Sequence, residues 1–346
     1  MSQVALKEAG MKSAELTNET STNDRVAKCG IARSAAIAAL FSLVSLSATL
    51  VGCATGHSEQ QQAHGTAQAA TADWKAVEQA IGRSGVMQPG DVYRFSMPRG
   101  DLKVTAKGVE IKPALALGSW AAFKMMDKGA MVMGDIVMTE DEVNPVISRL
   151  QQGGIEQTAV HHHIMGESPR ILYVHIGGHG DPVKLAETIK AAVDLTKTPS
   201  PAPSGGQEQP SEIGIDTKQI EQVLGYSGKI NGGVFQVTAP RAEKITEAGM
   251  DVPPSMGTGT AMNFQPTGGG KAAITGDFVM LASEVNPVIR ALRENGIEVT
   301  SLHNHMLNDE PRLFFMHFWA NDDAVKLARG LKPALNKTNS AKGQAK

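Results

Sequence analysis

The sequence predicts an α+β protein in which one β-α-β-β-α unit occurs twice, each copy having an antiparallel sheet with helices on one face. The first observation is an internal repeat with an offset of 142 residues. Gly134–Met138 (GDIVM) returns as Gly276–Met280 (GDFVM), and Glu142–Ile147 (EVNPVI) returns as Glu284–Ile289. The second observation is a Pro/Gly/Ser-rich segment, residues 198–211, which lies between the copies and cannot support a packed core.

Within the first copy, the hydrophobic pattern gives the elements in order. Residues 130–138 are apolar and typical of a buried strand, and residues 140–152 carry apolar side chains at helical spacing up to Gly153-Gly154. The remaining predicted elements are a strand at 155–164, a turn at 165–169, a strand at 170–176 and a helix at 182–195. This order is close to that of a split β-α-β ferredoxin-like sandwich.

The segment upstream of these elements is harder to interpret. Residues 74–129 begin with a short predicted helix, followed by a strand at Val92–Met97. The sequence does not place residues 100–129. Asn144-Pro145 and Asn286-Pro287 lie early in the predicted helices, where we expect each asparagine to cap the helix N-terminus.

Composition excludes several classes of protein. The 346 residues are 41% hydrophobic and 20% charged, which is typical of a globular protein. A net charge of −2 argues against a nucleic-acid partner, because phosphate binding requires a basic surface. The two cysteines, Cys29 and Cys53, are too few for a disulfide framework or a cysteine-based zinc site.

The N-terminal segment predicts export and lipid attachment. Basic residues precede an apolar stretch, residues 35–51, and the stretch ends in Leu50-Val51-Gly52-Cys53, which closely resembles a bacterial lipobox. The stretch is marginal in length for a transmembrane helix. We therefore expect lipidation at Cys53 and a membrane-anchored protein of the cell envelope, facing the periplasm or exterior. Ala54 favours the outer membrane in a Gram-negative host.

These features divide the whole chain into six parts. The predicted parts are a lipoprotein signal peptide at 1–52, a flexible tether at 53–72, repeat domain 1 at 73–197, a linker at 198–211, repeat domain 2 at 212–338 and a polar tail at 339–346.

Histidines carry most of the functional information. Six of them occupy matched positions in the two copies, whereas His162 faces Asn304 and His179 faces Asn321, so we interpret His162 and His179 as incidental. The matched pairs are His161 with His303, His163 with His305, and His175 with His317.

Strand alternation predicts where these side chains lie. His161 and His163 share one face of their strand, while Val160 and Ile164 point to the core. On the partner strand, His175 lies on the face that the helices do not cover, directly across from His161 if the hairpin loop has an odd length. The second copy fits this interpretation less well, because strand alternation places His317 on the same face as the apolar residues Phe315 and Leu313.

Two histidines on one strand and a third on its neighbour are an arrangement that binds zinc, as in carbonic anhydrase. Neutral imidazole also suits copper and nickel, so the predicted cofactor is a divalent transition metal, with Zn, Cu and Ni as candidates. Three alternatives stay open for the same residues: a small polar ligand, an interface between the copies, or surface positions without a role.

Other polar residues near the histidines are candidates for supporting roles. Glu167 and Asp309 lie in the turns and are candidate catalytic bases, and Arg170 and Arg312 can pair with these acids or bind an anion. Asp135 and Asp277 each follow a glycine inside an apolar strand, where a carboxylate is either functional or bonded to local backbone amides.

The doubled GD-x-VM strand, the EVNPVI helix, the H-x-H pair, the turn Pro-Arg and the later histidine together resemble the LppY/LpqO family of bacterial lipoproteins. The resemblance covers nearly all of residues 73–338 and implies an envelope lipoprotein with tandem domains, but no reaction. The second copy departs from the first at Asn304, where the first has His162.

Three functions are consistent with the sequence. The first is an anchored protein that binds a transition metal or a small polar ligand through its histidines. The second is a metal-dependent hydrolase or lyase of the envelope, with Glu167 or Asp309 as base. The third is a non-catalytic scaffold that binds a cell-wall component or another protein.

Overall fold

A computed structural model describes residues 73–201 and 212–343, and all of them belong to one compact unit, His64–Lys346. Several predicted features lie outside the described residues, namely the signal peptide at 1–52, the lipidation site Cys53, nearly all of the tether, most of the linker and the last three residues of the tail. None of the helices in the described ranges is long and apolar enough to span a bilayer.

The first repeat builds a six-stranded sheet and a small three-stranded sheet. Its elements are α1 (Trp74–Ile81), β1 (Val86–Gln88), β2 (Val92–Pro98), β3 (Val104–Ala106), β4 (Val109–Ile111), α2 (Pro113–Ala116), β5 (Gly118–Met125), β6 (Ala130–Thr139), α3 (Val143–Gln152), β7 (Glu156–His161), β8 (Glu167–Ser168), β9 (Ile171–Gly180) and α4 (Pro182–Val193).

The second repeat follows the same order, with a short 3₁₀ helix in place of α2. Its elements are α5 (Thr217–Leu224), β10 (Gly228–Asn231), β11 (Val234–Pro240), β12 (Thr246–Glu247), β13 (Met250–Asp251), η1 (Pro254–Met256), β14 (Gly259–Gly268), β15 (Lys271–Leu281), α6 (Ala282–Glu294), β16 (Glu298–His303), β17 (Asp309–Glu310), β18 (Leu313–Asp323) and α7 (Ala324–Leu335).

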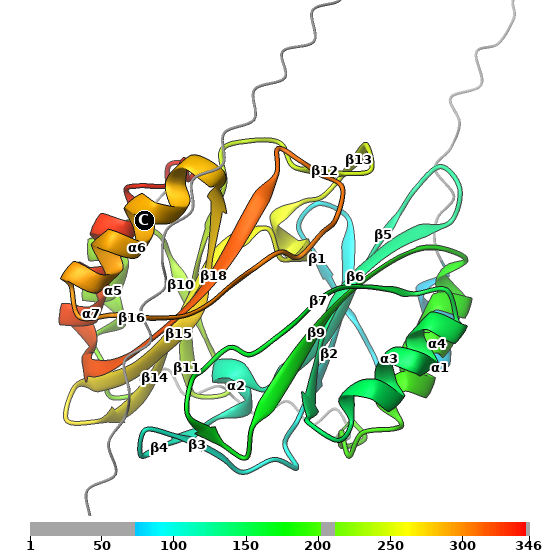
Figure 1. Ribbon diagram of the computed structural model, residues 1–346, viewed down its shortest axis with the longest axis horizontal. Coiled ribbons are helices and arrows are strands. Elements are labelled where there is room, and N and C mark those ends of the chain that lie inside the picture. Colours follow the sequence, from blue (N-terminus) through cyan, green and yellow to red (C-terminus); the bar gives the residue numbers. More distant parts are fainter. Residues whose placement is uncertain (1–72, 202–211, 344–346) are drawn as a thin grey trace, which may run out of the picture. The chain divides into compact units, whose positions relative to one another are not determined.

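Both large sheets have the predicted topology. The strand orders are β1-β2-β5-β6-β9-β7 and β10-β11-β14-β15-β18-β16. β9 pairs antiparallel with both β6 and β7, so β6 and β7 run parallel and α3 crosses between them. In each repeat the long helices lie on the outer side of the sheet, whereas α2 lies between the two sheets (Figure 1). The prediction of two α+β repeats with ferredoxin-like cores is confirmed.

The central strands are apolar because both of their faces are covered. Nine of the ten residues of β6 are buried, which explains why this strand lacks an alternating pattern. The glycine of the GD pair has a steric reason in both repeats. A Cβ atom at Gly134 or Gly276 would collide with the backbone oxygen of Trp120 or Ala261 on the neighbouring strand.

The sheet edge corrects two predictions about β7. Val160 lies opposite Val174, on the helix side as predicted, but its side chain is 51% exposed because β7 is the edge strand. The strand ends at His161, earlier than predicted, so Ile164 packs with residues of the inter-repeat cluster and not with the helix-side core.

The helix caps also differ from the prediction. The asparagines do not cap, because α3 begins at Val143 and α6 at Ala282, which places Asn144 and Asn286 inside the helices. Aspartate side chains accept hydrogen bonds from the first-turn amides of four other helices. These N-cap residues are Asp73, Asp181, Asp216 and Asp323.

A buried arginine joins the second strand of each repeat to the helix that follows the GD strand. Arg99 is fully buried and donates from Nη1 to Glu142 at 2.6 Å and to the backbone oxygen of Val137 at 2.9 Å. Arg241 makes the same bonds to Glu284 at 2.6 Å and to the oxygen of Val279 at 2.8 Å. The two networks fix the start of α3 and α6 against the sheets.

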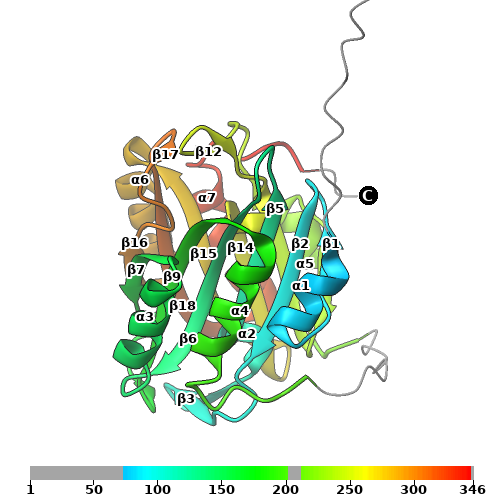
Figure 2. The ribbon, with the colours of Figure 1, turned by 90° about the vertical axis from the view of Figure 1, so that its right-hand side faces the viewer.

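Residues 100–129, which the sequence did not place, form β3, β4 and α2 before they enter β5. This arm reaches the other repeat, where α2 contacts β14 and β15. The corresponding arm of the second repeat carries η1, which contacts β5. Figure 1 and Figure 2 show β3 with α2 at one end of the sheets and β12 at the opposite end.

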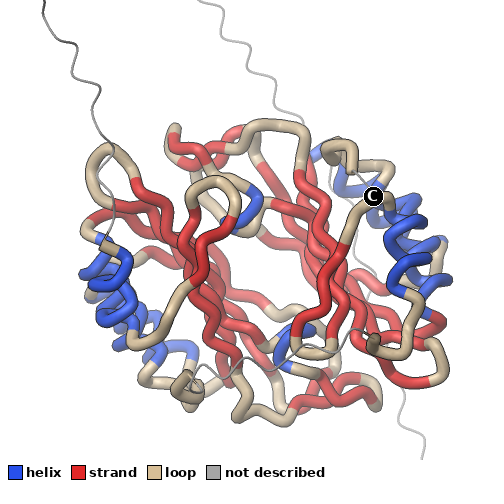
Figure 3. The backbone as a smooth tube through the Cα atoms, turned by 180° about the vertical axis from the view of Figure 1, so that it is seen from behind, coloured by secondary structure: helices blue, strands red, loops and turns tan. Residues whose placement is uncertain are grey.

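The faces that the helices leave free are packed against each other. Two apolar clusters contain residues of both repeats, one with Tyr173 beside Trp319 and one with Met133 beside Phe315. Figure 3 shows the long helices outermost and the strands of both sheets between them. The histidine face is therefore the interior of the molecule and not an open surface.

Candidate metal centre

Strands β7, β9, β16 and β18 carry the six matched histidines to the interface between the sheets. His161 ends β7 and His163 follows it, whereas His175 lies in the middle of β9. His175 pairs with Ala159 and His161 pairs with Tyr173, so the predicted direct pairing of His161 with His175 is wrong. The nine residues between β7 and β9 set this register, and the bulge between Gln157 and Ala159 lies beyond both pairs.

All six imidazoles form one cluster, to which each repeat contributes half. The rings of His161 and His303, which are matched residues, stack with their centroids 3.8 Å apart. Around this pair the distances repeat by two-fold symmetry. His163 lies 3.8 Å from His317 of the other repeat, and His175 lies 3.8 Å from His305. The sequence predicted one histidine set per repeat and left open whether the two sets meet, and the structure joins them in one shared cluster.

The two strand aspartates complete the cluster. Asp277 Oδ2 lies 2.9 Å from His305 Nε2, and Asp135 Oδ2 lies 3.6 Å from His163 Nε2. Asp135 Oδ1 is also 4.0 Å from His175 Nδ1. Of the two alternatives for these carboxylates, the contacts favour a place in the cluster over bonding to local backbone amides.

Backbone carbonyls fix the tautomers of three rings. Nδ1 of His161, His305 and His317 lies within hydrogen-bond distance of the oxygens of His162 (3.2 Å), Gly257 (3.2 Å) and Gly276 (2.6 Å). A carbonyl oxygen only accepts, so each Nδ1 carries the proton and each Nε2 keeps its lone pair. In metal sites the same bond orients the ligating ring.

The donor atoms of the cluster lie close together. His305 Nε2 lies 2.9 Å from Asp277 Oδ2 and accepts a hydrogen bond from His303 Nε2 at 3.1 Å, because the proton of His305 is on Nδ1. Seven buried atoms of the cluster have no hydrogen-bond partner, although buried polar atoms are normally paired. They are Asp135 Oδ1, His161 Nε2, His163 Nε2, His175 Nε2, Asp277 Oδ1, His303 Nδ1 and His317 Nε2.

Burial favours the neutral form of five imidazoles of the cluster. Loss of water, together with the neighbouring His317, lowers the pKa of His161 to about 2. Burial likewise lowers the pKa values of four others, namely His163, His175, His303 and His317. Neutral imidazole is the form that coordinates metal ions.

The two carboxyl groups respond differently to the same surroundings. Burial and the nearby Asp277 raise the pKa of Asp135 to about 8. Burial also acts to raise the pKa of Asp277, but the imidazoles of His317 and His305 outweigh burial and lower it. The pair therefore holds one proton at neutral pH, which a cation can replace.

Three sets of donors lie close enough to hold an ion. Within each set the donor atoms are within 4.8 Å of one another, and two sets include residues of both repeats. The sets are His161, His303 and His317; His175, His303 and His305; and Asp135, His161 and His163. Aromatic rings back the cluster, since Tyr173 stacks on His163 at 3.3 Å and Phe315 stacks on His305 at 3.5 Å.

Four residues that sequence reasoning treated as incidental or overlooked hold the two strands of the site together. His162 donates to the oxygen of Thr300 at 2.8 Å, and Asn304 donates to the oxygen of Thr158 at 2.8 Å. The threonine hydroxyls return the bond, to His163 and His305 respectively. Both threonines occur at the repeat offset, which was the available signal. His179 is exposed and lies outside the donor sets.

The turn residues stand apart from the cluster. Asp309 binds Arg312 at 2.9 Å and accepts from the amide of Leu313 at 2.6 Å, so its carboxylate is committed to its own turn. Glu167 accepts from the amide of Ile171 at 3.4 Å, and Arg170 is exposed. None of these residues belongs to a donor set found in the described ranges.

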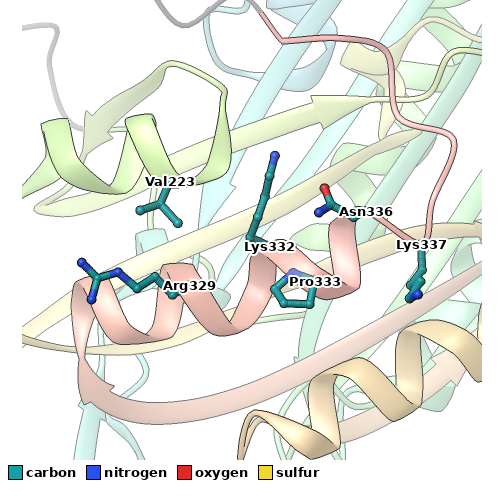
Figure 4. A pocket seen from close by; sticks show the side chains of 6 residues that line it. All are labelled: Val223, Arg329, Lys332, Pro333, Asn336 and Lys337. Carbon is teal, nitrogen blue, oxygen red and sulfur yellow. The ribbon is translucent and has the colours of Figure 1, made fainter.

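A larger hollow, of about 370 Å³, lies far from this chemistry on the outer helices. Figure 4 shows Val223 on α5 and the other five lining residues on or just after α7. Three of them are basic, namely Arg329, Lys332 and Lys337. The hollow contains none of the predicted site residues.

Comparisons with known proteins identify the family but no activity. No curated protein matches the chain. Two solved structures are similar over most of their length: a trimeric bacterial microcompartment shell protein, PduB (12% identity, 72% of this chain and 87% of that chain), and EtuB from Clostridium kluyveri (7% identity, 73% and 88%). Both have a TM-score of 0.17, which is too low to carry an argument.

The family comparison matches both repeats. The family described as Domain of Unknown Function (DUF1259) matches residues 75–195 and again residues 218–337. These two matches cover more than half of the chain, and each contains three of the clustered histidines. The chain therefore belongs to the DUF1259 family, with the domain present in two tandem copies.

Proposed function

We propose that this protein binds a divalent transition metal in a single centre that its two repeats build together. The observation that carries the proposal is the set of seven buried, unpartnered nitrogen and oxygen atoms in one cluster. Leaving one such atom unpaired costs about 1–3 kcal/mol, so seven in one cluster favour a shared partner. A metal ion satisfies several of these lone pairs at once.

The charge of the cluster favours one ion. Burial favours the neutral form of five imidazoles, and the two carboxylates can supply two negative charges. The nearby Arg94 already offsets part of this charge, so the cluster can balance no more than one divalent cation. A second such ion would leave uncompensated positive charge in a buried site, which is costly. The donor set of imidazole nitrogen and carboxylate oxygen suits Zn²⁺, Cu²⁺ and Ni²⁺.

The size of the adjacent space argues against the small-ligand alternative. The cavity next to His305 has a volume of about 30 Å³, enough for one or two water molecules. Organic ligands occupy pockets of about 300–1,000 Å³. Binding, and not hydrolysis, is the activity that the site supports best, because the carboxylate of Asp309 is held in its own turn.

A titration tests the proposal. Zn²⁺, Cu²⁺ and Ni²⁺ are added to the untagged, metal-free protein in competition with a chelator of known affinity. We expect binding tighter than micromolar for at least one ion and a loss of at least about 100-fold in His161→Ala, whose ring lies at the centre of the cluster. His179→Ala, at an exposed position, is the matched control and should bind as wild type. Affinity weaker than millimolar in wild type would refute the proposal.

We further propose that the protein is an envelope lipoprotein of the LppY/LpqO type, anchored through Cys53. The support is the lipobox-like Leu50-Val51-Gly52-Cys53 after an apolar stretch. Cys53→Ser should leave the protein unprocessed or release it from membranes. Wild-type fractionation and gel migration of this variant would contradict lipid anchoring.

A further inference from the structure

The two ends of the centre are related by the repeat offset but are not alike. Gly177 on β9 pairs with Glu156 on β7, and at the matched place Trp319 on β18 pairs with Glu298 on β16. Residues 177 and 319 both lie on the inner face of their strands, two positions beyond His175 and His317. At one end of the symmetric cluster this position is a glycine without a side chain, and at the other end it is a tryptophan.

The Gly177 end is hollow. Its cavity, of about 30 Å³, is lined by His305 of the centre together with Thr158 and Gly177. A Cβ atom at Gly177 would have Thr158 Cγ2 at 3.7 Å as its nearest neighbour, and the backbone there is not left-handed. A side chain can therefore be added at this position without a backbone clash, and only the glycine keeps the space free.

The Trp319 end is filled. The Trp319 side chain is 2% exposed and belongs to an apolar cluster with Val234 and Ala273 of its own repeat and Leu115 of the other. Outside it, Lys107 of the first repeat forms an ion pair with Glu298. The Trp319 side chain and the ion pair of Lys107 with Glu298 together close this end.

The two ends also differ in charge, and this difference again favours entry of a cation at the Gly177 end. The counterpart of Lys107 is Ala248, and both residues have a φ of 49° in the same turn of the arm. Glu156 is exposed, and no ion pair involves it among the described residues. Glu247 also lines the cavity. The hollow end therefore presents carboxylates without a lysine, and a negative potential attracts cations and speeds their association.

We propose that metal ions reach and leave the centre through the Gly177 end, and that Trp319 with Lys107 closes the other end. This inference rests on the proposed metal centre and adds the route to it. The narrow, negatively lined cavity admits a cation that has shed most of its water and excludes anions and organic chelators. The tandem repeat has thus kept the ligands symmetric and made the access one-sided.

Stopped-flow absorbance of Co²⁺ uptake by the full, metal-free chain tests the route. Gly177→Val should slow uptake by at least about tenfold and change the equilibrium affinity for Co²⁺ much less, because it fills the cavity and removes no ligand. Ala248→Lys, which copies Lys107 on the exposed surface, should slow uptake several-fold at low ionic strength and less at high salt. Lys107→Ala is the matched control at the closed end and should load at the wild-type rate.

The outcomes separate the route from the centre. If wild type binds Co²⁺ but Gly177→Val and Ala248→Lys both load at its rate, the route is wrong and the centre stands. Equal effects of Lys107→Ala and Ala248→Lys would also overturn the one-sided route. If wild type takes up no Co²⁺, the centre and the route both fail. Should Gly177→Val not fold, the two surface variants decide, since exposed positions tolerate substitution.

Discussion

At the scale of single residues, the centre is defined by where each imidazole proton lies. Nδ1 of His161 and of His317 donates to a backbone oxygen, which leaves each Nε2 unprotonated inside the cluster. The same burial that removes water from these rings holds them neutral. A buried cluster of unpaired nitrogen and oxygen atoms binds a cation strongly, and it destabilises the fold when no cation is bound.

The pH dependence of the metal-free protein follows from these pKa values. Five imidazoles have pKa values lowered in the fold, so below about pH 6.5 the unfolded chain binds protons that the folded chain does not. Stability then falls as pH falls, by up to about 1.4 kcal/mol per pH unit for each such proton. Asp135, whose pKa is raised to about 8, makes the folded chain more stable as pH falls, but this single group is outweighed by the five imidazoles.

Urea unfolding of the metal-free chain at pH 7.5 and pH 5.5 measures this effect. We expect the free energy of unfolding to be several kcal/mol lower at pH 5.5. Equal stability at the two pH values would show that the imidazoles are accessible to protons in the folded state.

At the scale of elements, the repeats owe their rigidity to the buried arginine networks as well as to the sheets. Arg99 bridges β2 to the start of α3 and also binds Asp101 at 2.9 Å. Arg241 repeats this with Glu284 and Glu243. Because α3 leads directly into β7, this network also positions the strand that delivers His161.

Removing the arginine should be costly. Arg99→Ala leaves the carboxylate of Glu142 buried without its cationic partner, and such a change costs about 3–5 kcal/mol of folding stability. Arg241→Ala should behave alike in the second repeat. The exposed pair of Lys190 with Asp194 is the control, since Lys190→Ala should cost less than about 1 kcal/mol. Chemical denaturation measures all three, and a small effect of Arg99→Ala would contradict the structural role.

The elements show how far sequence reasoning reaches. Periodicity predicted most helices and strands from residue 130 onward, because their helix-side apolar faces pack within one repeat, but it missed β8 inside the predicted turn at 165–169. It did not place the arm at residues 100–129, whose apolar residues, such as Leu115, pack in a cluster that includes the other repeat. Strand alternation placed the histidines on the correct face. The register of β7 on β9 depends on the path of the nine residues that connect them, which the hydrophobic pattern does not encode.

At the scale of the whole molecule, duplication has produced an interface between matched surfaces of one chain. Contacts such as that of His163 with His317 recur between His305 and His175, as in a two-fold symmetric dimer. The sequence showed that six histidines were matched, but not that the two sets meet. Phe315 and Leu313, which looked inconsistent with an exposed histidine face, are explained because that face is buried in the interface.

The central claim is that both repeats build one centre. Its most direct test is the amount of zinc bound per chain, measured by elemental analysis of untagged protein after equilibration with Zn²⁺ and removal of free metal. We predict about one ion per chain in wild type and almost none in either His161→Ala or His303→Ala, because these two rings stack at the centre of the cluster. Two ions in wild type, with one lost in each variant, would instead show two independent sites and contradict a shared centre.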